Sequence, residues 1–334
     1  MQTFLKRSRS IQRPVMAATL ALSFTATAWP AMAQNFPTGP LRIIIPFTAG
    51  GTADVVSRGV AVGLGELLGQ PVLSENRPGA NTIVGAEAVA RSAPDGHTML
   101  LSTGSALVVN PAAYKKLPYD AIRDFTAVAK AASNFHLVMA RKGFGPNNIP
   151  ELIKLAKSKP GSVSYGSSGI GSPPHFAGML LESVTGTQML HIPYKGISQA
   201  VTDLLGENLD IAAMGPSAAI GHMKAGKLKP LIATSDKRLD TAPDVPTMQE
   251  IGYAGFTTGS WFVLVARAGT PVPVITRLNR DINAVLQRQA VREKLEAEGF
   301  MVDGNLSPAQ VTKFIADEYT RWGKTIRDAK IQFD

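Results

Sequence analysis

The chain contains no cysteine in its 334 residues. This absence rules out a disulfide scaffold, a thiol nucleophile, a thiolate zinc site and a cysteine-anchored lipoprotein. It also suits an oxidising compartment, where a stray thiol would be a liability. Long apolar runs are missing too: outside the N-terminus, none reaches the ~18 residues that a spanning helix needs. With 45% hydrophobic and 18% charged residues, the sequence is globular and is neither disordered, collagen-like nor a coiled coil.

The first 33 residues have the three parts of a secretory signal peptide. Residues 1–13 carry four basic side chains and no acid, residues 16–29 are apolar and small, and Ala31-Met32-Ala33 forms an A-x-A cleavage site. We therefore predict cleavage after Ala33 and a mature start at Gln34. The alternative is a short membrane anchor, but the apolar run is too short and no stop-transfer charges follow it.

Removal of this segment leaves a mildly basic protein. The formal net charge falls from +9 to +5, because the segment holds four of the 34 basic residues and no acid. That balance, without a dense basic stripe interleaved with aromatics, predicts no nucleic-acid partner and only a weak attraction for anionic solutes. At ~150 residues per domain, the length of the mature chain suggests two domains.

Short β-rich runs alternate with helical stretches along the mature chain. Residues 41–47 (LRIIIPF) are apolar apart from Arg42, as expected for a strand buried on both faces. A β-α-β-α-β series follows, with helices over 53–68 and 82–92 and strands over 72–75 and 98–102. Such a series favours an α/β fold with a doubly wound, mostly parallel sheet.

A second series of the same kind occupies the middle of the chain. The predicted helices are 150–158, 173–185, 198–205 and a helix through 222–225, and the predicted strands are 163–166, 188–191, 209–213 and 228–234. The C-terminal third has a strand over 261–265 and helices over 274–286 and 308–330.

Two β-like stretches, 125–140 and 255–265, are candidates for crossings between domains. Two crossings place the middle of the chain in one lobe and both ends in the other. We therefore predict a signal peptide (1–33), a discontinuous first lobe (34–132 plus 256–334) and a second lobe (133–255). Open α/β sheets bind ligands at the carboxyl ends of their strands, so a ligand is expected in the cleft between the lobes.

The first candidate binding segment is residues 46–54, PFTAGGTAD, between the first predicted strand and helix. Adjacent Gly50 and Gly51 let the backbone approach a ligand, and a helix N-terminus offers unpaired N–H groups. Without a lysine or arginine, this loop suits a small carboxylate held by neutral donors. The alternative is that the glycines only make the turn while Thr52 or Asp54 caps the helix.

The second candidate segment is residues 165–175, YGSSGIGSPPH, again between a strand and a helix. Ser172 has the character of an N-cap with Pro173 at the first helical position. The two prolines carry no N–H, so this helix start is a poor anion site, and donors must come from hydroxyls and from residues 169–172. His175 either packs or caps in the first turn, or contacts the ligand.

Signatures of enzymes are mostly missing. The five histidines lack paired metal-ligand spacing, and no G-x-S-x-G elbow or Walker A loop occurs. The G-x-G of residues 169–171 fails the dinucleotide fingerprint. We therefore expect no metal, no cofactor and no catalytic residue. The alternative from another class is a secreted hydrolase that uses Ser168 or Ser172 with His175.

Many short motifs together resemble one family over nearly the whole mature chain, the substrate-binding proteins of tripartite tricarboxylate transporters, or Bug-type periplasmic receptors. The motifs are PFTAGGTAD (46–54), ENRPGA (75–80), APDGHTML (93–100), NPAAYKKLPYD (110–120), SYGSSGIGSPPHFAG (164–178), HIPYKG (191–196), DLLGENLDIA (203–212), HMKAGKLKPLIATS (222–235) and APDVPT (242–247).

This resemblance implies a two-lobed Venus-flytrap fold of the type II periplasmic kind, in which loops of both lobes hold a small carboxylated solute. In the first lobe it implies ligand contacts from Phe47, Thr48, Ala49, Gly50, Gly51, Thr52 and Asp54, with Ser102, Thr103, Gly104 and Ser105 beside them. In the second lobe it implies Ser167, Ser168, Gly169, Gly171, Ser172 and His175, with Tyr194, Lys195, Gly196 and Met214 nearby. Two departures bear on ligand identity: Thr48 replaces the usual proline, and residues 213–217 are about one residue shorter than the family form and lack its frequent acidic or amide residue.

The resemblance implies a monomeric periplasmic solute-binding protein that captures a mono-, di- or tricarboxylate and performs no chemistry. The lobes would close on the ligand, and a tripartite-type membrane permease would recognise the closed form. The alternative within binding proteins is an orphan receptor that signals.

Overall fold

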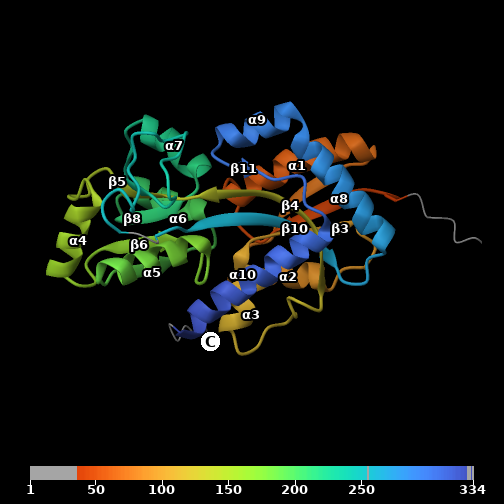
Figure 1. Ribbon diagram of the computed structural model, residues 1–334, viewed down its shortest axis with the longest axis horizontal. Coiled ribbons are helices and arrows are strands. Elements are labelled where there is room, and N and C mark those ends of the chain that lie inside the picture. Colours follow the sequence, from red (N-terminus) through yellow and green to blue (C-terminus); the bar gives the residue numbers. More distant parts are fainter. Residues whose placement is uncertain (1–35, 254–255, 329–331, 333–334) are drawn as a thin grey trace, which may run out of the picture. The chain divides into compact units, whose positions relative to one another are not determined.

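Two β-sheets, each flanked by helices, form the core of the computed structural model (Figure 1). The structure describes residues 36–253, 256–328 and 332. The predicted signal peptide (1–33) therefore lies outside the described residues, as do the last two residues of the helix predicted over 308–330. Among the described helices, none has both the length and the apolar character needed to span a bilayer.

The first sheet has the strand order β11-β4-β10-β3-β1-β2. Its strands are β1 (Leu41–Ile45), β2 (Val72–Asn76), β3 (Thr98–Ser102), β4 (Phe125–Phe135), β10 (Gly259–Arg267) and β11 (Met301–Val302). Helices α1 (Thr52–Leu68), α8 (Val272–Gln287) and α9 (Gln289–Ala297) lie on one side of it, and α2 (Ile83–Ala90), α3 (Asn110–Ala113) and α10 (Pro308–Asp328) on the other (Figure 1). Helices on both sides explain why residues 43–45 of β1 are fully buried.

The second sheet has the strand order β7-β6-β8-β5-β9. Its strands are β5 (Leu137–Arg141), β6 (Ser164–Ser167), β7 (Leu190–Pro193), β8 (Ile211–Met214) and β9 (Leu228–Ala233). Helices α4 (Ile149–Ser158) and α5 (Pro173–Thr185) bury one set of apolar residues against this sheet, and α6 (Ile197–Leu205) and α7 (Pro216–Lys224) bury another.

The predicted α/β class is confirmed, and one detail of it needs correction. The sheets are mixed rather than mostly parallel: β1 pairs in parallel with β2 and β3, and β6 with β7 and β8, whereas β4, β10 and β11 in the first sheet and β5 and β9 in the second pair antiparallel. The reason is the crossing of the chain. It leaves the first sheet along β4 and returns along β10, so these neighbouring strands run in opposite directions.

Four short elements lie where the sequence pattern indicated none. A π-helical turn, η1 (Ser105–Val109), runs directly into α3, and α9 and the two-residue β11 follow α8. The apolar run in η1 has no helical periodicity, and Pro111 inside α3 is typical of a turn. Helix α9 buries only Leu295 well, so its apolar pattern is weak.

The two connections between the sheets meet at Thr234. His136, the single residue between β4 and β5, donates its backbone N–H to Thr234 Oγ1 (2.8 Å), and its carbonyl accepts from Thr234 N (2.9 Å). Just before β10, Thr258 N donates to the Thr234 carbonyl (3.0 Å). One threonine therefore holds both crossings at neighbouring positions.

Candidate functional site

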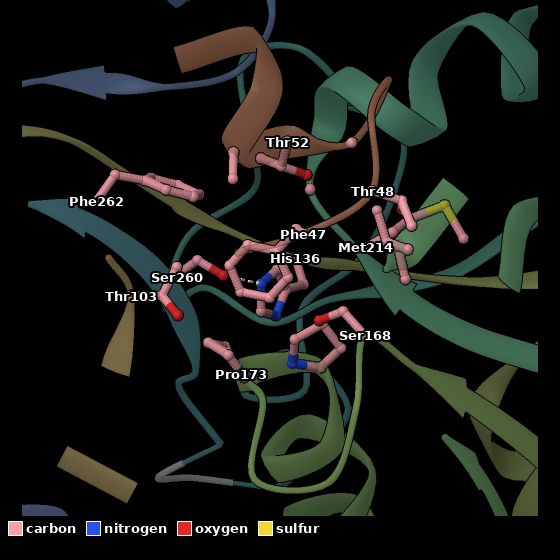
Figure 2. Close-up of a pocket in the computed structure, with 15 residues that line it drawn as sticks. Phe47, Thr48, Thr52, Thr103, His136, Ser168, Pro173, Met214, Ser260 and Phe262 are labelled. Atoms are coloured by element: carbon pink, nitrogen blue, oxygen red, sulfur yellow. Dashed lines mark hydrogen bonds between the residues drawn. The ribbon is translucent and has the colours of Figure 1, made fainter. Parts of the chain in front are cut away.

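A small cavity lies where loops and helix starts of both sheets converge (Figure 2). Its lining consists of Phe47, Thr48, Gly51, Thr52, Ala53, Thr103, His136, Ser168, Pro173, Pro174, Ile197, Met214, Gly215, Ser260 and Phe262. It leaves about 40 Å³ to the centres of water-sized molecules, whereas one buried water needs roughly 10–15 Å³ on that measure. The site therefore has room for a small molecule.

The cavity lining is neutral. It contains hydroxyls, one imidazole, apolar side chains and backbone, but no aspartate, glutamate, lysine or arginine. In the part of the chain that the structure describes, no cluster of histidine and acidic side chains could hold a metal ion. A charged ligand here would be balanced by dipoles and hydrogen bonds rather than by an ion pair.

The N-terminus of α1 forms one wall of this cavity. Gly51 is the extended N-cap residue, and Thr52 and Ala53 are the first helical residues. The first N–H groups of a helix have no carbonyl partner within it, and they carry the positive end of the helix dipole. Helix α1 has 17 residues, so its dipole is fully developed at this end. The wall therefore offers several backbone donors to an acceptor.

Asp54 does not line the cavity and instead holds the loop before α1. Its carboxylate accepts from the Gly50 amide (3.1 Å), from Arg58 Nε (3.0 Å) and from Asn76 Nδ2 (3.1 Å). Burial alone would raise the pKa of Asp54, but these hydrogen bonds outweigh burial and lower it. Of the two interpretations of this residue, the geometry favours the structural one.

Helix α5 presents the opposite wall without amide donors. Ser172 caps this helix by accepting from His175 N (3.4 Å). Pro173 and Pro174 line the cavity with their rings and lack N–H groups. Ser168 adds a hydroxyl to this side of the cavity (Figure 2). The second wall therefore contributes shape and one hydroxyl, whereas Ser167 and residues 169–172, which the sequence also offered as donors, do not line this cavity.

His175 is part of an aromatic stack under the second loop. Its ring lies 4.0 Å from that of His191 and 6.4 Å from that of Tyr165, centroid to centroid. Its Nδ1 accepts from Gly171 N (2.9 Å), and His191 Nε2 pairs with Ser167 Oγ (2.7 Å). Burial, and secondarily the neighbouring His191, lower the pKa of His175 to about 3. The geometry favours the packing interpretation of His175.

Acid is expected to destabilise the protein before its carboxylates titrate. Burial also lowers the pKa values of His136 and His191 to about 4, whereas an unfolded histidine titrates near 6.5. Between pH 6.5 and 4 the unfolded state therefore binds protons that the folded state does not. Stability is full above pH 6.5 and should fall by up to about 1.4 kcal/mol per pH unit for each buried histidine.

Urea unfolding at pH 7.5, 6.5 and 5.5 measures this slope. His191→Gln is the matched control, since its amide can still reach Ser167 but cannot titrate in this range. Its slope should be shallower than that of the parent protein. Equal stability of the parent at pH 7.5 and 5.5 would show that these histidines are not held neutral.

The remaining predicted site residues lie around the cavity lining rather than in it. Ser102 is buried and donates to the Thr103 carbonyl (3.0 Å), and Ser105 Oγ bonds the Gly171 carbonyl (3.5 Å). Ala49 and Gly50 form the exposed turn before α1, and Gly104 packs against Trp261. A neighbouring cavity is lined by Gly169, Tyr194 and Lys195 and shares Ser168 with the first.

Loops of the two sheets touch beside the cavity. Thr48 Oγ1 and Ser198 Oγ lie 2.8 Å apart, and a Cβ built on Gly196 would lie 2.0 Å from Thr48 Oγ1. Thr48, the departure from the family's proline, therefore makes a hydroxyl contact that proline could not make. The backbone of Gly196 is extended, a conformation that any residue can adopt. Glycine is therefore needed here because the two loops approach closely, and not because of its conformational freedom.

Several cavity residues were not predicted from the sequence. His136 lies on the connection between the sheets and Ser260 in the adjoining β10, with His136 Nε2 and Ser260 Oγ 2.8 Å apart (Figure 2). Phe262, Ile197 and Gly215 complete the lining. Only the position of a histidine within an apolar, β-like crossing could have drawn attention to His136.

Comparisons with known proteins identify the family of the chain. A family model described as the tripartite tricarboxylate transporter family receptor matches residues 56–331. The chain is 37% identical over 309 residues to protein BugT of Bordetella pertussis, covering 91% of this chain and 94% of that protein.

Two solved structures show the same fold. The periplasmic binding protein BugD is 33% identical, with a TM-score of 0.85 over 89% of this chain and 99% of its own. A protein of R. palustris solved with adipate is 31% identical, with a TM-score of 0.85 over 89% and 99%. The chain is therefore a two-lobed solute-binding protein, and it belongs to the tripartite tricarboxylate transporter receptor family.

Proposed function

We propose that the cavity captures a small organic carboxylate, held mainly by the amides of residues 51–53 at the start of α1. The observation that carries this proposal is the coincidence of a 17-residue helix's N-terminus with a neutral cavity of small size. Unpaired N–H groups and the helix dipole favour an anion there without a cationic side chain. The adipate bound to one relative supports the same ligand class.

Native mass spectrometry of the purified protein tests the proposal directly. A receptor of this kind is expected to retain its ligand, which should be a mono-, di- or tricarboxylate. Retention of a cationic or uncharged solute, or failure of every carboxylate in a calorimetric panel, would contradict the assignment.

We infer further that the two lobes close around the ligand and that a tripartite-type permease receives the closed form. The boundaries proposed are lobe 1 over 34–132 and 256–334 and lobe 2 over 133–255. The hydrogen bonds of His136 and Thr258 to Thr234 support a hinge at this place. A signalling role without a permease remains the alternative, and co-purification of the liganded protein with that permease distinguishes the two.

The geometry does not favour a serine hydrolase. Nδ1 of His175 accepts a backbone N–H, and the Ser172 hydroxyl accepts the His175 amide as a helix cap. With a pKa of about 3, this imidazole is too weak a base to activate a hydroxyl at neutral pH. Binding without chemistry is therefore the function that the site supports best.

Export supplies a separate prediction. The mature protein should begin at Gln34 and should be recovered from the periplasmic fraction, because residues 31–33 form the A-x-A site. Intact-mass measurement of the exported protein identifies its first residue. A start beyond Phe36, or recovery with the membranes, would contradict a cleaved signal peptide.

A further inference from the structure

Two buried polar side chains at the crossing between the sheets have no partner for part of their hydrogen-bonding capacity. His136 is 1% exposed, and within the described residues its Nδ1 has no partner. Asn134 is 2% exposed, and neither of its amide atoms has one. Buried polar groups are nearly always hydrogen-bonded in folded proteins. Two such groups, two residues apart, indicate that something polar is bound beside them.

Both residues belong to the cavity or its wall. His136 lines the cavity (Figure 2). A Cβ built on the cavity residue Gly215 would lie 2.5 Å from Asn134 Nδ2, so this amide lies directly behind the lining. The unpartnered groups therefore lie at the end of the cavity formed by the crossing, in or directly behind its lining.

We propose that His136 is a specificity-determining residue, and that its Nδ1 selects carboxylates bearing a hydroxyl over the same acids without one. This inference rests on the proposed carboxylate-binding function. The helix α1 amides would hold the carboxylate, while the imidazole bonds the hydroxyl.

The chemistry of the histidine favours a hydroxyl over other substituents. Burial without a counter-charge lowers the pKa of His136 to about 4, so the ring is neutral at pH 7. Nε2 is engaged with Ser260, and depending on the tautomer Nδ1 is either a donor or an acceptor. A hydroxyl can donate and accept, so it satisfies either tautomer. A second carboxylate or a keto oxygen can only accept.

The expected difference in affinity follows from the free energy that is lost when a buried polar group has no hydrogen-bond partner. An acid without the hydroxyl displaces water from the cavity and leaves Nδ1 buried and unpaired. One such lost hydrogen bond corresponds to roughly 10- to 100-fold in affinity. A hydroxy acid whose hydroxyl reaches Nδ1 should therefore bind more tightly, by about this factor, than the same acid without the hydroxyl.

The test is calorimetry at pH 7.5 with three matched pairs of acids: lactate and propionate, 3-hydroxybutyrate and butyrate, and malate and succinate, with both enantiomers of each hydroxy acid. In the parent protein at least one pair should show the preference. His136→Asn places polar atoms at the position of Nδ1, so this variant should retain much of the preference for the hydroxy acid. His136→Gln places a polar atom only at the position of Nε2, where it can still contact Ser260. In this variant the hydroxy acid and the acid without the hydroxyl should bind about equally tightly.

The outcomes separate the inference from the function on which it rests. Equal binding within every pair, or an unchanged preference in His136→Gln, overturns the role of His136 and leaves carboxylate capture standing. Binding of no carboxylate at all overturns both. Circular dichroism of the two variants establishes that they fold, and the ratio within a pair is insensitive to a general loss of affinity.

Discussion

Replacing Thr52 with proline should weaken carboxylate binding by roughly 10- to 150-fold without destabilising the fold. Thr52 is the first residue of α1, where proline is well tolerated and where α5 and α7 of this protein carry Pro173 and Pro216. Gly51 before it is extended (φ −89°, ψ 175°), as the residue preceding a proline should be. The change removes one amide donor, and a hydrogen bond to a charged acceptor contributes roughly 1.5–3 kcal/mol.

Thr52→Ala is the matched control, since it removes the hydroxyl and keeps the amide. Its effect should be no more than about tenfold, the value of one neutral hydrogen bond. Ser168→Ala, on the opposite wall, should change the preference among acids more than the affinity for all of them. Calorimetry with a carboxylate panel measures the three variants, and thermal unfolding checks their stability. If Thr52→Pro binds as the parent does while Ser168→Ala binds nothing, the ligand is anchored on the second loop.

The sequence predicted the elements of the fold well because their signals are local. The apolar residues at 41 and 43–45 identify a strand buried on both faces, and Ser172 with Pro173 marks the start of α5 at the observed residue. The predicted parallel character was wrong for β4, β5, β9, β10 and β11, four of which flank the two crossings. Their direction depends on where the chain crosses between the sheets, and no local pattern encodes that.

The sequence indicated those cavity residues that lie at or just before the start of a helix. Gly51 and Thr52 at α1 and Ser168 before α5 were expected to face the ligand, and they line the cavity. His136 and Ser260 were not, because each lies in a β-like apolar stretch and their proximity depends on pairing of β4 with β10. His175 was a candidate on position alone, and its stack with His191 depends on β6 and β7 lying side by side.

Gly196→Ala is expected to prevent closure and to weaken binding by at least about 100-fold. The added Cβ would lie 2.0 Å from Thr48 Oγ1 and 3.1 Å from the Thr48 amide nitrogen, so the two loops could not approach as they do here. The backbone of residue 196 is extended, so alanine should not strain it, and the folded open state should be as stable as the parent. The steric clash raises the free energy of the closed state alone, so the closed state is populated less. A ligand that binds only the closed state then binds more weakly by the same factor.

Thr48→Ala provides the compensating change, because it removes the hydroxyl that collides with the new methyl group. Alone, it loses only the 2.8 Å contact with Ser198, a neutral hydrogen bond whose loss should weaken binding no more than about tenfold. Combined with Gly196→Ala, it should restore a large part of the lost affinity, so the two effects should be strongly non-additive. Small-angle scattering should show that saturating ligand contracts the parent and the double variant, but not Gly196→Ala. Additive losses, with contraction in all three proteins, would mean that the Thr48–Gly196 contact plays no part in closure.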